Sequence, residues 1–174
     1  MTLAVCLLLD DRGERAVRRL WRRLEDDGIG TLLTHTHRRH VPHLSYAVLR
    51  SYDLDEVTAA LTKLPDAGPV TLRFDALGMF RRSRTWLVPA VTAELAGRQE
   101  RVVTALESTG ADLHQHYLPG AWIPHCTLAV RSQLERLPTI AAAVYDVLPL
   151  VTTADRAALV DTSTGARRPL GTLP

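Results

Sequence analysis

The spacing of apolar and polar positions along the chain predicts an α+β protein in which strands and helices alternate. Short continuous apolar runs indicate buried strands, whereas apolar residues three and four positions apart indicate helices with one buried face. The expected strands are Leu3–Leu9, Val41–Leu49, Val70–Phe80, Trp86–Val91, Ile123–Val130 and Ala157–Val160. The expected helices are Asp11–Asp27, Leu54–Leu64, Thr92–Ser108 and Leu134–Val147, and the tail from Thr162 is expected to be loosely structured.

An internal repeat divides this pattern into two similar halves. A shift of 82 positions places the segment Pro42-His43-Leu44-Ser45-Tyr46-Ala47-Val48 on Pro124-His125-Cys126-Thr127-Leu128-Ala129-Val130, with four of the seven positions identical. The same shift also matches the Leu-Glu pair and the glycine at the ends of two expected helices, Leu24, Glu25 and Gly28 with Leu106, Glu107 and Gly110. Agreement at both a helix end and a strand favours duplication over a chance match. Two such halves are expected to pack about a pseudo-twofold axis, with His43 and His125 on opposite sides of one cleft.

Each repeated segment presents an imidazole and a hydroxyl on one face of a strand, because side chains alternate between faces. His43 and Ser45 share a face, and so do His125 and Thr127. A neutral imidazole can accept a proton from an attacking hydroxyl or water, while a charged imidazole donates one to a departing oxygen. The two hydroxyls are suited to hydrogen-bond phosphate oxygens as charge develops on them. The pattern therefore predicts phosphodiester chemistry by two histidines, without a metal or another cofactor.

The two motifs, His43-Leu44-Ser45-Tyr46 and His125-Cys126-Thr127-Leu128, resemble the paired motifs of the 2H phosphoesterases, the superfamily of 2′-5′ RNA ligase-like proteins and cyclic nucleotide phosphodiesterases. Trp122-Ile123-Pro124, Phe80 and Arg84-Thr85-Trp86-Leu87 support the resemblance, and serine at position 45 departs from the commoner threonine. The resemblance implies a single domain over residues 1–174, built from two pseudo-symmetric lobes, with two antiparallel sheets lining a central cleft and helices outside. It also implies action on 2′,3′-cyclic phosphates or 2′-5′ linkages of nucleotides or RNA ends.

Composition narrows the classes of function. The net charge of +2 argues against a protein that coats long nucleic acid, although all basic residues except Lys63 are arginines, which suit phosphate recognition. Two cysteines in apolar runs, Cys6 and Cys126, form no disulfide framework. The apolar run at Leu3–Leu9 is too short to span a membrane. We expect a cytoplasmic protein that acts as a monomer, with no obligate protein partner and no attachment to membranes.

Further residues are candidates for holding the substrate. The loop before the first motif carries His37, Arg39 and His40, which suit a phosphate or a base, although a solvated polar loop explains them equally well. Arg84 is the preferred phosphate contact in the basic turn Arg81-Arg82-Ser83-Arg84, and Trp122 is a candidate for stacking on a base.

Other interpretations stay open. The pairs His35-x-His37 and His114-x-His116 have a spacing found in some metal sites, but no third ligand is fixed nearby. The same residues would also serve a module that binds a nucleotide or RNA end without turnover. RNA 2′-5′ ligation is a third possibility, since it is the reverse of cleavage at the same site.

Overall fold

The computed structural model describes residues 2–81 and 84–174, so Arg82 and Ser83 of the basic turn lie outside the described residues. The strands are β1 (Leu3–Leu9), β2 (His43–Ser51), β3 (Val70–Phe80), β4 (Arg84–Pro89), β5 (Asp112–Leu113), β6 (Cys126–Ala129), β7 (Leu150–Asp161) and β8 (Arg167–Pro169). The helices are α1 (Asp11–Asp26), α2 (Leu54–Thr62), α3 (Ala93–Glu107) and α4 (Leu137–Tyr145), with short 3₁₀ turns η1 (Gln115–Tyr117) and η2 (Leu134–Arg136). Within the described residues, no helix has both the length and the apolar character that a membrane span needs.

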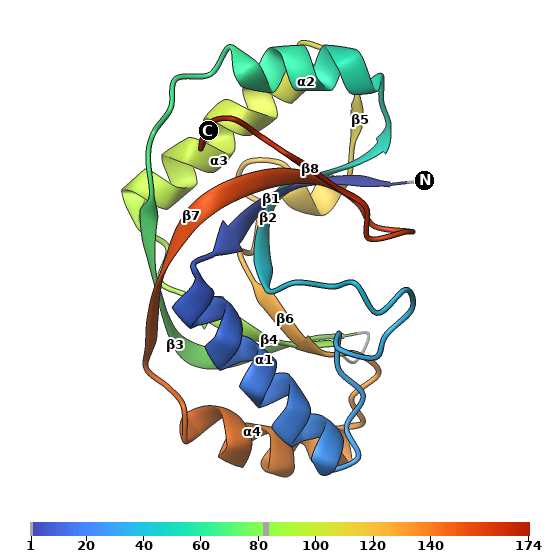
Figure 1. Ribbon diagram of the computed structural model, residues 1–174, viewed down its shortest axis with the longest axis vertical. Helices are drawn as coiled ribbons and strands as arrows, with labels where there is room; N and C mark the ends of the chain where they lie inside the picture. Colours follow the sequence, from blue (N-terminus) through green and yellow to red (C-terminus); the bar gives the residue numbers. More distant parts are fainter. Residues whose placement is uncertain (1, 82–83) are drawn as a thin grey trace.

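All the strands join one antiparallel sheet in the order β5-β2-β1-β7-β3-β4-β6, and β8 pairs with β7 outside this order. The helices lie at the two ends of the molecule, α2 and α3 at the top and α1 and α4 at the bottom of Figure 1. The α+β class, with helices outside an antiparallel framework, is thus confirmed. The two expected sheets are joined into one because β3 and β7 pair directly, from Val70 opposite Ala154 to Phe74 opposite Leu150.

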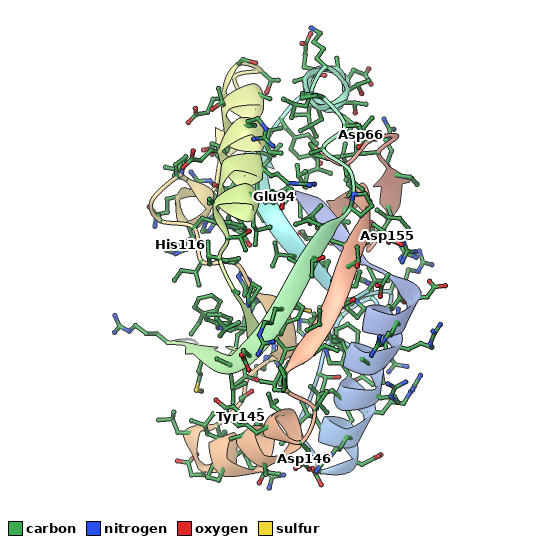
Figure 2. All side chains as sticks on the ribbon, turned by 90° about the vertical axis from the view of Figure 1, so that its left-hand side faces the viewer. Asp66, Glu94, His116, Tyr145, Asp146 and Asp155 are labelled. Atoms are coloured by element: carbon green, nitrogen blue, oxygen red, sulfur yellow. The ribbon has the colours of Figure 1, made fainter. Side chains whose placement is uncertain are left out.

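The order of elements repeats with the offset seen in the sequence. β1, α1, β2, α2 and β3 correspond to β4, α3, β6, α4 and β7 when the numbering is shifted by 82. Thr71 and Thr153, which are separated by that offset, are direct partners on β3 and β7. The pair Val70–Ala154 becomes Leu72–Thr152 under the same shift, and both pairs are present. A pseudo-twofold axis therefore passes through the Thr71–Thr153 pair, and Figure 2 shows these two strands side by side between α3 and α1.

The two halves of the chain interlock. α1 packs on β6 and α4, whereas α3 packs on β2 and α2. The indole Nε1 of Trp21 on α1 donates to the carbonyl of Thr127 over 3.2 Å, and the amide Nε2 of Gln99 on α3 donates to the carbonyl of Tyr46 over 3.2 Å. Each motif-bearing strand is thus covered by a helix from the other half of the sequence.

The apolar face expected on the first helix is confirmed, and it anchors the core. Val17, Leu20, Trp21 and Leu24 are each at most 3% exposed. On the motif strands Leu44, Tyr46 and Leu128 are fully buried. Because side chains alternate along a strand, the imidazoles and hydroxyls of the motifs point to the opposite face. Packing of the helices behind the strands therefore decides which way the motif side chains point.

Three expectations about the second half need correction. The strand at Ile123–Val130 is shorter, Cys126–Ala129, because Pro124 has no N–H to donate to a ladder. The last strand is longer than Ala157–Val160 and spans Leu150–Asp161. The tail is not loose: β8 pairs with β7, and the N–H of Leu173 donates to a carboxylate oxygen of Asp66 over 3.1 Å.

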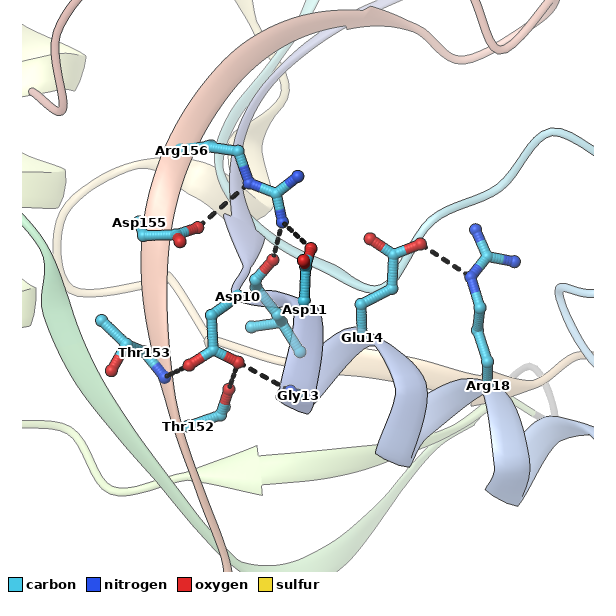
Figure 3. Close-up of polar contacts among 10 residues, drawn as sticks. Asp10, Asp11, Gly13, Glu14, Arg18, Thr152, Thr153, Asp155 and Arg156 are labelled. Atoms are coloured by element: carbon cyan, nitrogen blue, oxygen red, sulfur yellow. Dashed lines mark hydrogen bonds and ion pairs between the residues drawn. The ribbon is translucent and has the colours of Figure 1, made fainter.

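Asp10 fixes the start of α1 against β7 (Figure 3). One carboxylate oxygen accepts from the N–H of Gly13 (2.7 Å) and the hydroxyl of Thr152 (2.9 Å), and the other accepts from the N–H of Thr153 (3.1 Å). Burial raises the pKa of Asp10, but these hydrogen bonds and the charge of Arg12 outweigh it and hold the pKa below its usual value. Gly13 permits the close approach, since a Cβ there would lie 1.9 Å from the Thr152 hydroxyl oxygen.

Candidate active site

The two motif histidines have the same local geometry. His43 opens β2, and its Nδ1 is 2.7 Å from the carbonyl oxygen of Val41. His125 directly precedes β6, and its Nδ1 is 2.7 Å from the carbonyl oxygen of Ile123. In both cases a proline, which has no N–H and a fixed φ, stands between the histidine and that carbonyl. The repeated apolar-Pro-His sequence thus produces the same turn twice.

This turn decides which ring nitrogen carries the proton. A carbonyl oxygen only accepts hydrogen bonds, so Nδ1 of each imidazole must be the donor. In the neutral form of either ring the free lone pair is therefore on Nε2, and in the charged form Nε2 carries a second N–H. Each histidine keeps one nitrogen for chemistry, as acceptor or as donor.

The two imidazoles belong to one electrostatic site. Burial lowers the pKa of His43, while its bond to the Val41 carbonyl raises it. Burial also lowers the pKa of His125, against its bond to the Ile123 carbonyl, and the charges of His43 and Arg84 lower it further. β2 and β6 are in contact, and the backbone N–H of His43 approaches the thiol of Cys126. The neutral forms are favoured, and protonating one ring opposes protonating the other.

The hydroxyls of the motifs lie two residues after the histidines. Ser45 is 7% exposed, and its Oγ is 3.5 Å from Sγ of Cys6 on the paired strand β1. Thr127 is half-buried on β6, directly opposite Trp86 of β4. By strand alternation, each hydroxyl is expected on the same face as the imidazole of its own motif.

An aromatic wall stands beside His125. The rings of Phe80 and Trp86 stack with centroids 4.9 Å apart, and both meet the His125 ring edge-on, at 5.0 Å and 5.7 Å. Trp86 lies flat over Gly78, where a Cβ would come within 2.5 Å of the indole. These contacts hold the His125 ring in its orientation.

Tyr117 joins the site although no sequence pattern singled it out. Burial raises the pKa of Tyr117 to about 12, and among the weaker influences the nearby Ser45 side chain lowers it. Gln99 of α3 holds the tyrosine in place by donating to its carbonyl over 2.6 Å. Its phenol remains protonated at neutral pH and can donate a hydrogen bond next to Ser45.

Arg84 and Trp122, two further candidates for holding the substrate, lie in different surroundings. Arg84 is exposed at the start of β4, and its positive charge lowers the pKa of His125, His35 and His40. The indole Nε1 of Trp122 donates to the carbonyl of Ser45 over 3.0 Å, and its ring packs 6.1 Å from that of Tyr46. Arg84 thus has its charge near the histidines, while Trp122 ties the approach to the second motif to the strand of the first.

The loop before the first motif holds a cluster of imidazoles. The rings of His37 and His40 are 4.0 Å apart, and Nδ1 of His37 accepts from the backbone N–H of Arg39 over 3.0 Å. Burial lowers the pKa of His40 to about 4, aided by the charges of His37, His43, His35 and Arg84. The structure therefore places His40 near His43, whereas Arg39 is exposed to solvent.

The alternative pair His114-x-His116 is held by a local hydrogen bond. The Nδ1 of His114 accepts from the backbone N–H of His116 over 3.3 Å. In the part of the chain covered by the structure, no three or more histidine, cysteine, aspartate or glutamate side chains are grouped to hold a metal ion.

Comparison with known proteins decides the family. The model of the 2′-5′ RNA ligase superfamily matches residues 9–166. The chain belongs to this superfamily. The resemblance to 2H phosphoesterases seen in the two motifs is thereby confirmed. No curated protein matches the sequence.

Solved structures show the same fold over almost the whole chain. A crystal structure described as a phosphoesterase has a TM-score of 0.62 at 16% identity and covers 98% of this chain and 95% of its own. E. coli LigT complexed with NADP+ gives 0.62 at 14% identity, covering 97% and 93%. Kluyveromyces marxianus Usb1 gives 0.56 at 13% identity, covering 99% and 98%. At these identities the likeness establishes the fold alone.

Proposed function

We propose that this protein is a phosphodiesterase that opens 2′,3′-cyclic phosphates or cleaves 2′-5′ linkages of nucleotides or RNA ends by acid/base catalysis with His43 and His125. One observation carries the proposal: both Nδ1 atoms bind a backbone carbonyl at 2.7 Å, so Nε2 is the nitrogen that each ring uses for proton transfer. Membership of the 2′-5′ RNA ligase superfamily supports it.

Hydrolysis of a cyclic phosphate uses both histidines. The Nε2 of one neutral histidine takes a proton from water as the water oxygen bonds to phosphorus. The bond between phosphorus and one ribose oxygen breaks, and the Nε2–H of the other, charged histidine protonates that oxygen. For a 2′-5′ linkage the neighbouring 3′-hydroxyl attacks in place of water, and the 5′-oxygen leaves. Ligation is the reverse of this second reaction.

The remaining residues are proposed to stabilise charge on the phosphate. Ser45 and Thr127 donate hydrogen bonds to its non-bridging oxygens, and Arg84 approaches from the exposed side. Tyr117 adds a neutral donor beside Ser45. Phe80 and Trp86 hold His125 in its orientation and do not bond the substrate.

The test is hydrolysis of 2′,3′-cyclic nucleotides and short 2′-5′ oligonucleotides in the presence of EDTA. We expect activity in the wild-type protein, a loss of about 100- to 10,000-fold in His43→Ala and in His125→Ala, and normal activity in the control His114→Ala. Full activity in both motif variants would refute the two-histidine mechanism. Tight binding of a cyclic nucleotide by the wild type with no product would show a binding module instead.

A further inference from the structure

A second feature for phosphate recognition lies beside the first motif. A pocket of about 410 Å³ is lined by four arginines, Arg18, Arg38, Arg39 and Arg167, together with His40 and Val41. Neither His43 nor His125 lines it. The pocket is therefore distinct from the site of the proposed chemistry.

Three separate segments are packed together to form this arginine pocket. Arg18 comes from α1, Arg38 and Arg39 from the loop before β2, and Arg167 from β8. The hairpin between β7 and β8 rests on that loop at Gly165, where a Cβ would lie 2.5 Å from the His37 ring. Gly165 has a φ of +71°, which favours glycine, so the packing depends on this residue. The arginines are thus brought together by the fold.

The charge of the arginine pocket is only partly balanced. Nε of Arg18 pairs with Glu14 at 2.8 Å, and its NH2 group donates to the carbonyl of His40 over 3.2 Å. Among the described residues, no ion pair involves Arg38, Arg39 or Arg167. The nearby carboxylate of Asp161 accepts from the N–H and hydroxyl of Ser163 in its own turn. Guanidinium groups present paired donors that match phosphate oxygens. The excess positive charge of the arginine pocket therefore favours a phosphate as its ligand.

The arginine pocket and the two-histidine site share a wall. Val41 lines the pocket, and its carbonyl oxygen accepts from Nδ1 of His43 at 2.7 Å. His40 lines the pocket too, and the charges of His43 and Arg84 are among the causes that lower its pKa, after burial. The pocket therefore adjoins the histidine site through His40 and Val41, and a nucleic-acid strand that holds one phosphate between the histidines has further phosphates to offer the arginines.

We propose that the arginine pocket binds a backbone phosphate of an RNA strand whose reactive phosphate lies between His43 and His125. This inference rests on the proposed function and sharpens it: the preferred substrate is an oligonucleotide rather than a single nucleotide. The pocket contacts add to binding and take no part in proton transfer.

The experiment compares two substrates with the same terminal base, a 2′,3′-cyclic mononucleotide and a short RNA ending in a 2′,3′-cyclic phosphate. Loss of one charged hydrogen-bonding partner of a phosphate costs about tenfold. For the double variant Arg38→Gln/Arg167→Gln we expect the ratio of kcat/KM for the RNA to kcat/KM for the mononucleotide to fall at least about tenfold, through KM of the RNA. Arg101→Gln, an exposed position on α3, is the control and should leave the ratio unchanged.

An unchanged ratio in the double variant, with its fold verified by circular dichroism, would overturn the inference. Binding of a fluorescent RNA ending in a 3′-phosphate separates this inference from the proposed function, because it needs no turnover. If the wild type binds this RNA without turning over cyclic phosphates, the proposed function fails. Weaker binding by the double variant would then still support the pocket. Weaker binding of inorganic phosphate by the variant, with RNA binding intact, would show a small-anion site and overturn the inference.

Discussion

At the scale of single residues, one hydrogen bond sets the chemistry of each motif histidine. Because Nδ1 of both rings is held by the carbonyl two residues earlier, both rings present Nε2, and neither has a fixed role as acid or base. Their surroundings differ, since Phe80, Trp86 and the charge of Arg84 act on His125. This asymmetry offers a way to assign the roles.

Arg84→Gln should identify which limb of the pH profile belongs to His125. The arginine's charge lowers the pKa of His125, so its removal should move that pKa up toward the ordinary value of about 6.5. In a profile of kcat/KM against pH, the acidic limb should shift to higher pH if His125 is the base. The alkaline limb should shift to higher pH if His125 is the acid. The matched control Arg101→Gln should move neither limb. A profile with both limbs unmoved in Arg84→Gln would show that the guanidinium does not act on His125.

The motif residues could be predicted from the sequence, whereas their neighbours could not. Strand alternation alone places Ser45 with His43 and Thr127 with His125. Tyr117 lies in a 3₁₀ turn near Ser45, and Gln99 of α3 binds its carbonyl, which is a contact between distant segments. Trp86 faces His125 because β4 pairs with β6, and no local pattern reports that pairing.

At the scale of elements, boundaries follow the sequence where a local signal marks them. β1 and β3 begin and end where the apolar runs do, and α1 ends one residue before its expected end. β5 and β8, with two and three residues, are too short for any periodicity and exist through their partners β2 and β7.

The start of α1 provides a stability test of the structure. Asp10→Ala removes the acceptor for three donors and should lower the free energy of unfolding by about 1–2 kcal/mol. Asp53→Ala, at the exposed cap of α2, where only the N–H groups of Asp55 and Glu56 are bound, is the matched control and should cost less. Since the folded-state pKa of Asp10 lies below its unfolded value, its contribution is present above the unfolded pKa and is lost as pH falls through the folded pKa.

Urea unfolding of the wild type and both variants, at acidic and at neutral pH, measures these free energies of unfolding. The deficit of Asp10→Ala relative to wild type should shrink at the acid end. Equal losses in the two variants at neutral pH would mean that the link from α1 to β7 contributes no stability.

At the scale of the whole molecule, the repeat could be predicted from the sequence but the interlocking of its halves could not. The shift of 82 residues relates five elements of one half to five of the other, with Thr71 and Thr153 meeting on the axis. Periodicity shows that α1 has a buried face, but not that this face covers β6 of the other half. Descent of the two halves from one duplicated unit stays a prediction.

The interlocking matters for the site. Each motif strand is held from behind by a helix of the other half, through Trp21 on Thr127 and Gln99 on Tyr46. The two histidines are therefore positioned by one shared core, and the arginine pocket extends this arrangement past His40 and Val41.

Cleavage of a matched pair of substrates by His43→Ala and His125→Ala is the sharpest test of the two-histidine mechanism. The first substrate is a 2′-5′-linked dinucleotide, and the second is the nucleoside 2′-(p-nitrophenyl phosphate), whose leaving oxygen needs no proton. We expect one variant to lose about 100- to 10,000-fold in activity on the dinucleotide but to regain most of it on the p-nitrophenyl ester, because this variant lacks only the acid. The other variant, lacking the base, should lose activity on both. Equal losses on the two substrates in both variants would contradict a division of acid and base between His43 and His125.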